Sequence, residues 1–210
     1  MTVDGGERGS ALLPVTLVMC LFAAIVVGAA AVVRVDVMVA GHFRQSAEAR
    51  YAAEAGLEVV LAELNALVTW APVVSGSRHS SFVDGSLLGR KTVPGGGTVT
   101  VCCENGSVAD RLSIETRLSP LPVRRGLDWK PYLWTPFDRL TSGDHPTRLY
   151  LAVWVAGEEG VSAGGESDET EAVMVRSDAV DPGGRRRTIE ALAHRHLGAA
   201  LRVMAWREVR

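Results

Sequence analysis

The chain has few residues of the kinds that form covalent scaffolds or reactive sites. Three cysteines occur among its 210 residues. Cys20 lies inside an apolar run, whereas Cys102 and Cys103 are adjacent in a stretch that reads as a β-strand. Neighbouring residues of a strand point to opposite faces, and a bridge between them requires unusual geometry, so we expect Cys102 and Cys103 to remain unbridged. The cysteines therefore predict neither a disulfide scaffold nor a metal site.

Recognisable catalytic and cofactor motifs are also scarce. Gly95-Gly96-Gly97 is not followed by the Lys and Ser or Thr of a phosphate-binding loop. His194 and His196 are expected to share one face of a strand, but no third metal ligand lies near them in sequence. We therefore expect no enzyme activity, no cofactor and no metal, with both histidines at the surface.

Positive charge is not in excess. The chain has 22 Lys and Arg against 24 Asp and Glu, which gives a net charge of −2. Nucleic-acid-binding domains usually carry a basic patch, so no nucleic-acid partner is predicted. Residues 157–171 are acidic and contain no basic residue. A solvated loop is expected there; a calcium site is the alternative, although the acidic residues match no calcium-loop spacing.

One long apolar run, Ala11–Val33, is what the sequence does have. Arg8 precedes the run, Arg34 follows it, and no residue between Ala11 and Val33 is charged. A helix needs roughly 20 apolar residues to cross a membrane core about 30 Å thick, so the run is long enough. We predict a membrane segment over residues 10–34. Three small residues would form its assembly face because they allow helix backbones to approach closely: Ala24, Gly28 and Ala31.

The next residues continue as an amphipathic helix over 35–70. There is no proline between Arg34 and Val68, and charged residues now interrupt the apolar pattern. Apolar residues recur at spacings of three and four: Ala53, Leu57, Val60, Leu61, Leu64, Leu67 and Val68. Pro72 ends the pattern. We predict one helix from about Leu12 to Val68, with Leu57, Leu61 and Leu64 buried against a globular domain.

Residues 71–210 read as that domain, which is β-rich. Strands are expected at 98–104, 108–118, 149–155, 172–180, 187–195 and 201–209. Asn105-Gly106 predicts a tight hairpin turn between the first two strands, and 181–184 predicts a second hairpin. Residues 73–97 and 119–148 read as irregular. The predicted fold class is α+β, with the long helix packed on an antiparallel sheet.

Aromatic residues gather in one of the irregular segments: Trp129, Tyr132, Trp134 and Phe137. We expect them to anchor this segment in the core, because large aromatic side chains bury much apolar surface. A partner-binding patch is the alternative.

Several segments also carry a family resemblance. They are Arg8–Leu13, Ala40–Arg44, Tyr51–Glu58 and, more weakly, 172–210, and Ala53-Glu54-Ala55-Gly56 is the most specific block. These segments resemble the PilX-type minor pilins, which belong to the type IV pilin-like proteins of bacterial pili and related secretion machines. The resemblance implies a pilin-like α+β fold and a structural role, as a minor pilin that helps to initiate or cap a pilus-like filament.

The resemblance also implies processing, location and partners. Prepilin peptidase would cut between Gly9 and Ser10, which makes residues 1–9 a leader peptide. The helix would then stay in the inner membrane, with the domain outside the cytoplasm, and would bind other pilins on the way to a surface filament. Two features depart from the family. Pro14 stands where the fifth mature residue is often Glu, and more arginines follow the apolar run than precede it, which opposes a cytoplasmic N-terminus.

Other functions stay open at this point. The chain could be a single-span anchor for an extracytoplasmic binding domain, or a minor pseudopilin of a type II secretion-like system. A secreted enzyme behind a signal peptide cut near Ala31 is a further alternative, but Asp4 and Glu7 make a poor basic leader. The cleavage position separates these functions: before Ser10, nowhere, or after about Ala31.

Overall fold

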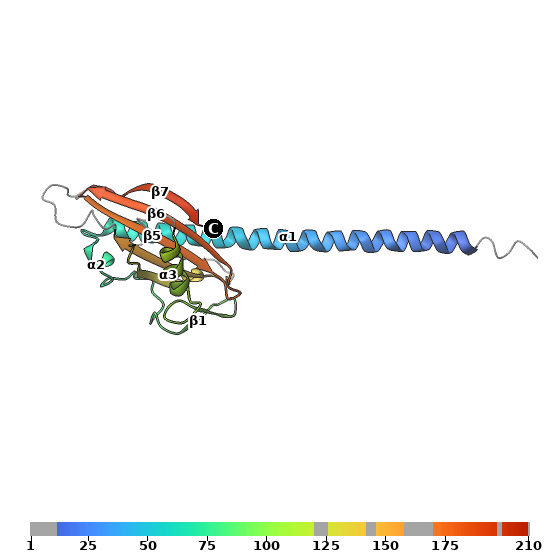
Figure 1. Cartoon of the computed structure of the whole chain (residues 1–210), viewed down its shortest axis with the longest axis horizontal. Coiled ribbons are helices and arrows are strands. Elements are labelled where there is room, and N and C mark those ends of the chain that lie inside the picture. Colours follow the sequence, from blue (N-terminus) through green and yellow to red (C-terminus); the bar gives the residue numbers. More distant parts are fainter. Residues whose placement is uncertain (1–11, 120–125, 142–145, 158–169, 197–198, 210) are drawn as a thin grey trace, which may run out of the picture. The chain divides into compact units, whose positions relative to one another are not determined.

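The computed structural model describes residues 12–119, 126–141, 146–157, 170–196 and 199–209. Its contacts divide the chain into two units, Met1–Ser46 and Ala47–Arg210. Several of the elements are labelled in Figure 1. In chain order they are α1 (Leu12–Ala66), α2 (Ala71–Val74), β1 (Arg90–Thr92), β2 (Thr98–Thr100), α3 (Val108–Leu118), β3 (Lys130–Pro136), the short 3₁₀ helix η1 (Phe137–Arg139), β4 (Tyr150–Gly157), β5 (Thr170–Val180), β6 (Arg186–His196) and β7 (Arg202–Val209).

The predicted long helix is confirmed as α1, which begins in the first unit and ends in the second. All residues from Leu12 to Gln45 are exposed, whereas buried residues recur from Ala49 onward. The helix ends at Ala66, two residues before the predicted end. Leu67 N donates to Leu64 O there, at 3.2 Å, and this three-residue turn tightens the helix end.

The second unit contains a five-stranded antiparallel sheet with the strand order β3-β4-β5-β6-β7. Four of its strands, β4 to β7, lie where the sequence predicts them. The predicted α+β class is therefore confirmed. β5 and β6 form the hairpin expected at 181–184, where Asp181 Oδ1 accepts from Arg185 N at 3.0 Å.

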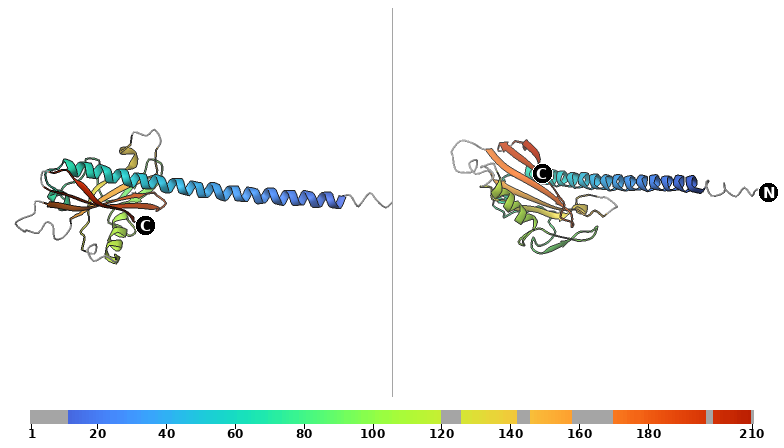
Figure 2. Two further views of the ribbon diagram at one scale, coloured as in Figure 1. Left: turned by 90° about the horizontal axis from the view of Figure 1, so that it is seen from above. Right: turned by 45° about the vertical axis from the view of Figure 1, so that its right-hand side comes forward.

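Alternate residues of β4 belong to two core clusters, and α1 and α3 cover opposite faces of the sheet (Figure 2). Leu151, Val153 and Val155 pack with the buried residues of α1. Tyr150, Ala152 and Trp154 pack with α3 and the small β1–β2 sheet. The sheet is thus covered on both faces, which explains why β4 is apolar throughout.

The strand and hairpin predicted around Asn105-Gly106 are wrong, because Val108–Leu118 forms α3. Ser107 is its N-cap: Ser107 Oγ accepts from Asp110 N at 3.2 Å, and Asp110 Oδ2 accepts from Gly106 N at 2.8 Å. These two hydrogen bonds satisfy backbone donors at the start of a helix, so the local chemistry favours a helix.

The cysteine prediction is also wrong. Strand β2 ends at Thr100, before the cysteines, and Cys102 and Cys103 are joined by a disulfide. Cys103 has a φ of +72°, so the chain turns here and does not continue as a strand. Cys20 is free and exposed.

Residues 73–97 and 119–148 were expected to be irregular. The first range instead contains the end of α2 and strand β1, and the second contains β3 and η1. β3 is an edge strand, which is where a sheet tolerates prolines such as Pro131 and Pro136. Tyr132 and Trp134 are buried, and Trp129 and Phe137 are half-buried. The expected anchoring of these aromatic residues in the core is confirmed.

Candidate functional site

The apolar half of α1 is the first feature that bears on function. Among the described residues, α1 is the one helix that is long and apolar enough to cross a membrane. Its large side chains lie open: Leu13 is 74% exposed, Phe22 63% and Val27 70%. A continuous apolar surface of this length is unfavourable in water, so this half of α1 is a candidate membrane-spanning segment.

Ala24, Gly28 and Ala31 are all exposed and, at spacings of four and three, lie on one face of this half. A Cβ added at Gly28 would meet no atom within 4 Å. Glycine inside a helix costs about 1 kcal/mol relative to alanine. The described fold gives no packing reason for that cost.

The Ala53–Gly56 block has a different environment, within the second unit. Ala53 is fully buried, and Arg50 Nε donates to Glu54 Oε1 at 3.0 Å. A Cβ added at Gly56 would lie 2.9 Å from Ser177 Oγ and 3.2 Å from Leu151 Cδ1. The block therefore brings α1 against β4 and β5. The predicted processing residues Gly9 and Ser10 lie outside the described residues.

The buried stripe of α1 differs in part from the prediction. Leu57 and Leu64 are buried as expected, together with Val60. Leu61 is only half-buried at the margin of the core, and Val68, beyond the helix, is 88% exposed. The stripe is thus narrower than the apolar pattern of the sequence.

Arg195 of β6 forms hydrogen bonds with the backbone directly after the C-terminal end of α1. Its guanidinium donates to Leu67 O at 2.5 Å and to Val68 O at 2.8 Å, and it lies 4.5 Å from the centre of the Trp70 ring. Glu171 holds the arginine from the other side at 2.6 Å. These contacts satisfy carbonyl oxygens that have no partner inside the helix.

Glu171 also accepts from Trp70 N at 2.8 Å. Burial by itself raises the pKa of this carboxyl, but the hydrogen bonds from Trp70 N–H and Arg195 outweigh it, so the pKa of Glu171 is lowered. The ionised carboxylate is therefore the form that the fold stabilises.

The opposite face of the sheet holds a buried charge network. Arg176, Asp178 and Glu190 are each no more than 2% exposed. Arg176 donates to Glu190 Oε1 at 3.1 Å, to Asp178 Oδ2 at 3.2 Å and to Glu115 Oε2 of α3 at 2.5 Å. Although burial lowers the pKa of Arg176, the charges of Asp178 and Glu115 raise it more, and the net shift is upward.

Two further arginines extend this network. Arg186 Nη2 donates to Glu115, and Arg207 Nη2 of β7 donates to Glu190 Oε2 at 2.9 Å. Burial raises the pKa of Glu115, but its contacts with Arg176 and Arg186 lower it below the usual value overall. The network joins α3, β5, β6 and β7 through paired charges.

The remaining sequence candidates show no assembled site. The rings of His194 and His196 lie 5.1 Å apart, centre to centre, with His196 exposed. No group of three His, Cys, Asp or Glu able to hold a metal occurs in the described part of the chain. Most of the acidic stretch, 158–169, lies outside the described residues.

One catalytic-type motif escaped the sequence reasoning: residues 160–164 read Gly-x-Ser-x-Gly. They too lie outside the described residues. The flanking elements are the strands β4 and β5, whereas this motif in hydrolases links a strand to a helix.

Comparison with models of protein families, with curated proteins and with solved structures finds no match to this chain. The fold and the apolar segment define a class: a chain with one candidate membrane-spanning helix near its N-terminus and an α+β unit.

Proposed function

We propose that this protein is a minor pilin, a structural subunit that sits in the inner membrane and helps to initiate or cap a type IV pilus-like filament. One observation carries the proposal. A single helix, α1, combines an exposed apolar half with a half that packs on an antiparallel sheet. An ordinary membrane anchor has no need for its helix to continue into the domain core.

Gly28 adds support, since a glycine without a packing partner in its own chain is suited to close contact with a second helix. Pro14 lies in the first turn of α1, where the absent backbone N–H has no helical partner to lose. Proline there cannot supply the charge of the family's usual Glu. A subunit present in few copies, at the start or tip of a filament, fits this difference.

Helix assembly can be tested by cysteine crosslinking in membranes that contain partner pilins. In a Cys20→Ser background, the two cysteines left are bridged to each other, so a single introduced thiol reports alone. We expect crosslinks to other pilins at positions 24, 28 and 31. Position 26, about half a turn away from both 24 and 28, is the matched control and should crosslink little.

Uniform absence of crosslinks, with filaments unchanged when the gene is deleted, would leave only the anchored binding domain. Crosslinks to components of a secretion system would instead favour the pseudopilin alternative. N-terminal sequencing separates processing from assembly: Gly9→Leu should retain the uncut precursor in a host with prepilin peptidase. Wild-type processing of Gly9→Leu would contradict cleavage at Gly9–Ser10.

A further inference from the structure

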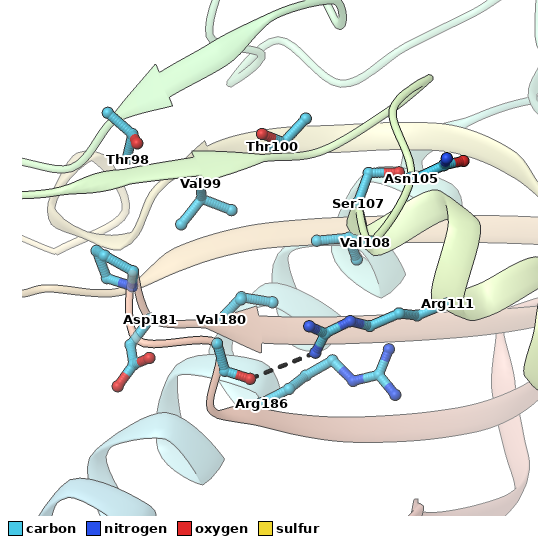
Figure 3. Close-up of a pocket in the computed structure, with 13 residues that line it drawn as sticks. Thr98, Val99, Thr100, Asn105, Ser107, Val108, Arg111, Val180, Asp181 and Arg186 are labelled. Carbon is cyan, nitrogen blue, oxygen red and sulfur yellow. Dashed lines mark hydrogen bonds between the residues drawn. The ribbon is translucent and has the colours of Figure 1, made fainter.

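A pocket of about 210 Å³ opens in the second unit, between the start of α3, strand β2 and the β5–β6 turn (Figure 3). Its charged lining residues are Arg111, Arg186 and Asp181. Pockets that enclose drug-sized ligands usually measure about 300 Å³ or more, so this one suits a small molecule or the terminal group of a larger one.

Arg111 is the uncompensated cation of this pocket. Its Nη1 donates to Gly184 O at 3.4 Å, the dashed line in Figure 3. Among the described residues it forms no ion pair. The carboxylates nearby are used elsewhere: Asp110 accepts from Gly106 N, and Asp181 accepts from Arg185 N and lies 3.7 Å from Arg185 Nε.

Arg186 lines the same pocket and keeps an unused donor. Its Nη2 pairs with Glu115, and its Nε lies 3.7 Å from Asp178 Oδ1. Its Nη1 is buried and has no hydrogen-bond partner in the described structure. Buried donors of this kind are rare and call for a missing partner.

The start of α3 borders the pocket through Ser107 and Val108, and the positive end of the helix dipole adds to the two guanidinium groups. We propose that the pocket binds a small oxyanion, a carboxylate or a phosphate group, between Arg111 and Arg186. Guanidinium groups recognise both kinds of anion through paired hydrogen bonds. Thr98 and Thr100 also line the pocket, but their side chains lie on the opposite side of β2 from Val99 (Figure 3), so the two arginines are the groups that would hold the anion.

Isothermal titration calorimetry on the full chain in detergent micelles tests this. The probes are inorganic phosphate, glucuronate as a carboxylate on a sugar, and glucose as the neutral control. We expect saturable binding of at least one anion with a dissociation constant of about 1 mM or lower, and none of glucose. The stronger of the two anions identifies the source of the oxyanion.

Arg111→Gln should weaken that binding at least about tenfold, because a charge-assisted hydrogen bond is lost. Arg117→Gln is the matched control, since Arg117 is exposed on the same helix outside the pocket and bonds to Ser113. Arg111→Lys keeps the charge without the paired donors and should bind with intermediate strength. Absence of saturable anion binding, or equal binding by wild type and Arg111→Gln, would overturn the proposal.

Discussion

At Gly56, α1 has no room for a side chain. Gly56→Val would drive a branched side chain against Ser177 and Leu151, and overpacking of this kind costs about 1–3 kcal/mol of unfolding free energy. Gly41→Val is the control on the same helix, because a Cβ there meets nothing within 4 Å. Chemical denaturation of the full chain in detergent measures both. Equal stabilities for the two variants would show that α1 and the sheet do not approach closely at Gly56.

The buried charge network shows which contacts of single residues could be predicted from the sequence and which could not. Arg176 and Glu190 are register partners in the β5–β6 hairpin, as are Asp178 and Thr188. Counting outward from a turn at 181–184 pairs Val180 with Arg185 and Arg176 with Ile189. The connection is one residue longer, 181–185, and this shift is what brings Arg176 opposite Glu190. Glu115 could not be found in the same way, because its segment was predicted as a strand and the contact joins residues 61 apart in sequence.

Among the elements, α1 is stabilised by a narrow buried stripe. Leu64→Ala should cost about 2–5 kcal/mol, because it leaves a cavity at a fully buried site. Leu61→Ala should cost less, since Leu61 lies half-buried at the margin of the core. Glu58→Ala, at an exposed position, should change stability by no more than about 0.5 kcal/mol. Denaturation of the three variants in parallel checks this order, and equal losses at Leu64 and Glu58 would contradict the assignment of the buried face.

The two wrong element predictions have physical reasons. In α3, Leu112, Ile114, Thr116 and Leu118 alternate as in a strand, but burial falls on Val108 and Leu112, four residues apart. The N-cap, in which Ser107 Oγ accepts from Asp110 N, favours the helix, and alternation alone does not reveal it. The prolines of β3 made its sequence read as irregular. The strand forms nevertheless because β3 lies at the edge of the sheet and pairs with one neighbour only. Long periodic segments such as α1 gave the reliable predictions.

For the molecule as a whole, two paired carboxylates imply a pH-dependent stability. The pKa values of Glu115 and Glu171 are both lowered from the usual 4.5 in the folded state. Their stabilisation is therefore complete above about pH 4.5 and is lost as the pH falls through the lowered values, because the unfolded chain then binds more protons. Denaturation midpoints measured from pH 7 down to pH 3 should fall at the acid end.

The double variant Glu115→Gln and Glu171→Gln tests the origin of this acid loss. Its stability should be lower than that of wild type at pH 7 but should change less as the pH falls. Glu58→Gln, which alters an exposed carboxylate of α1, should follow the wild-type profile. If the double variant and wild type lose stability in parallel, other groups cause the acid sensitivity.

If neighbouring subunits hold the N-terminal helix, as the proposed function implies, Arg195 has a mechanical consequence. Tension on the first half of α1 travels along the helix backbone into the second unit, where the core stripe and the Arg195 contacts with Leu67 O and Val68 O resist it. Arg195 lies in β6, which is flanked by β5 and β7. The load therefore enters the interior of the sheet, and extraction of the helix end must break several charge-assisted hydrogen bonds together instead of peeling one edge strand.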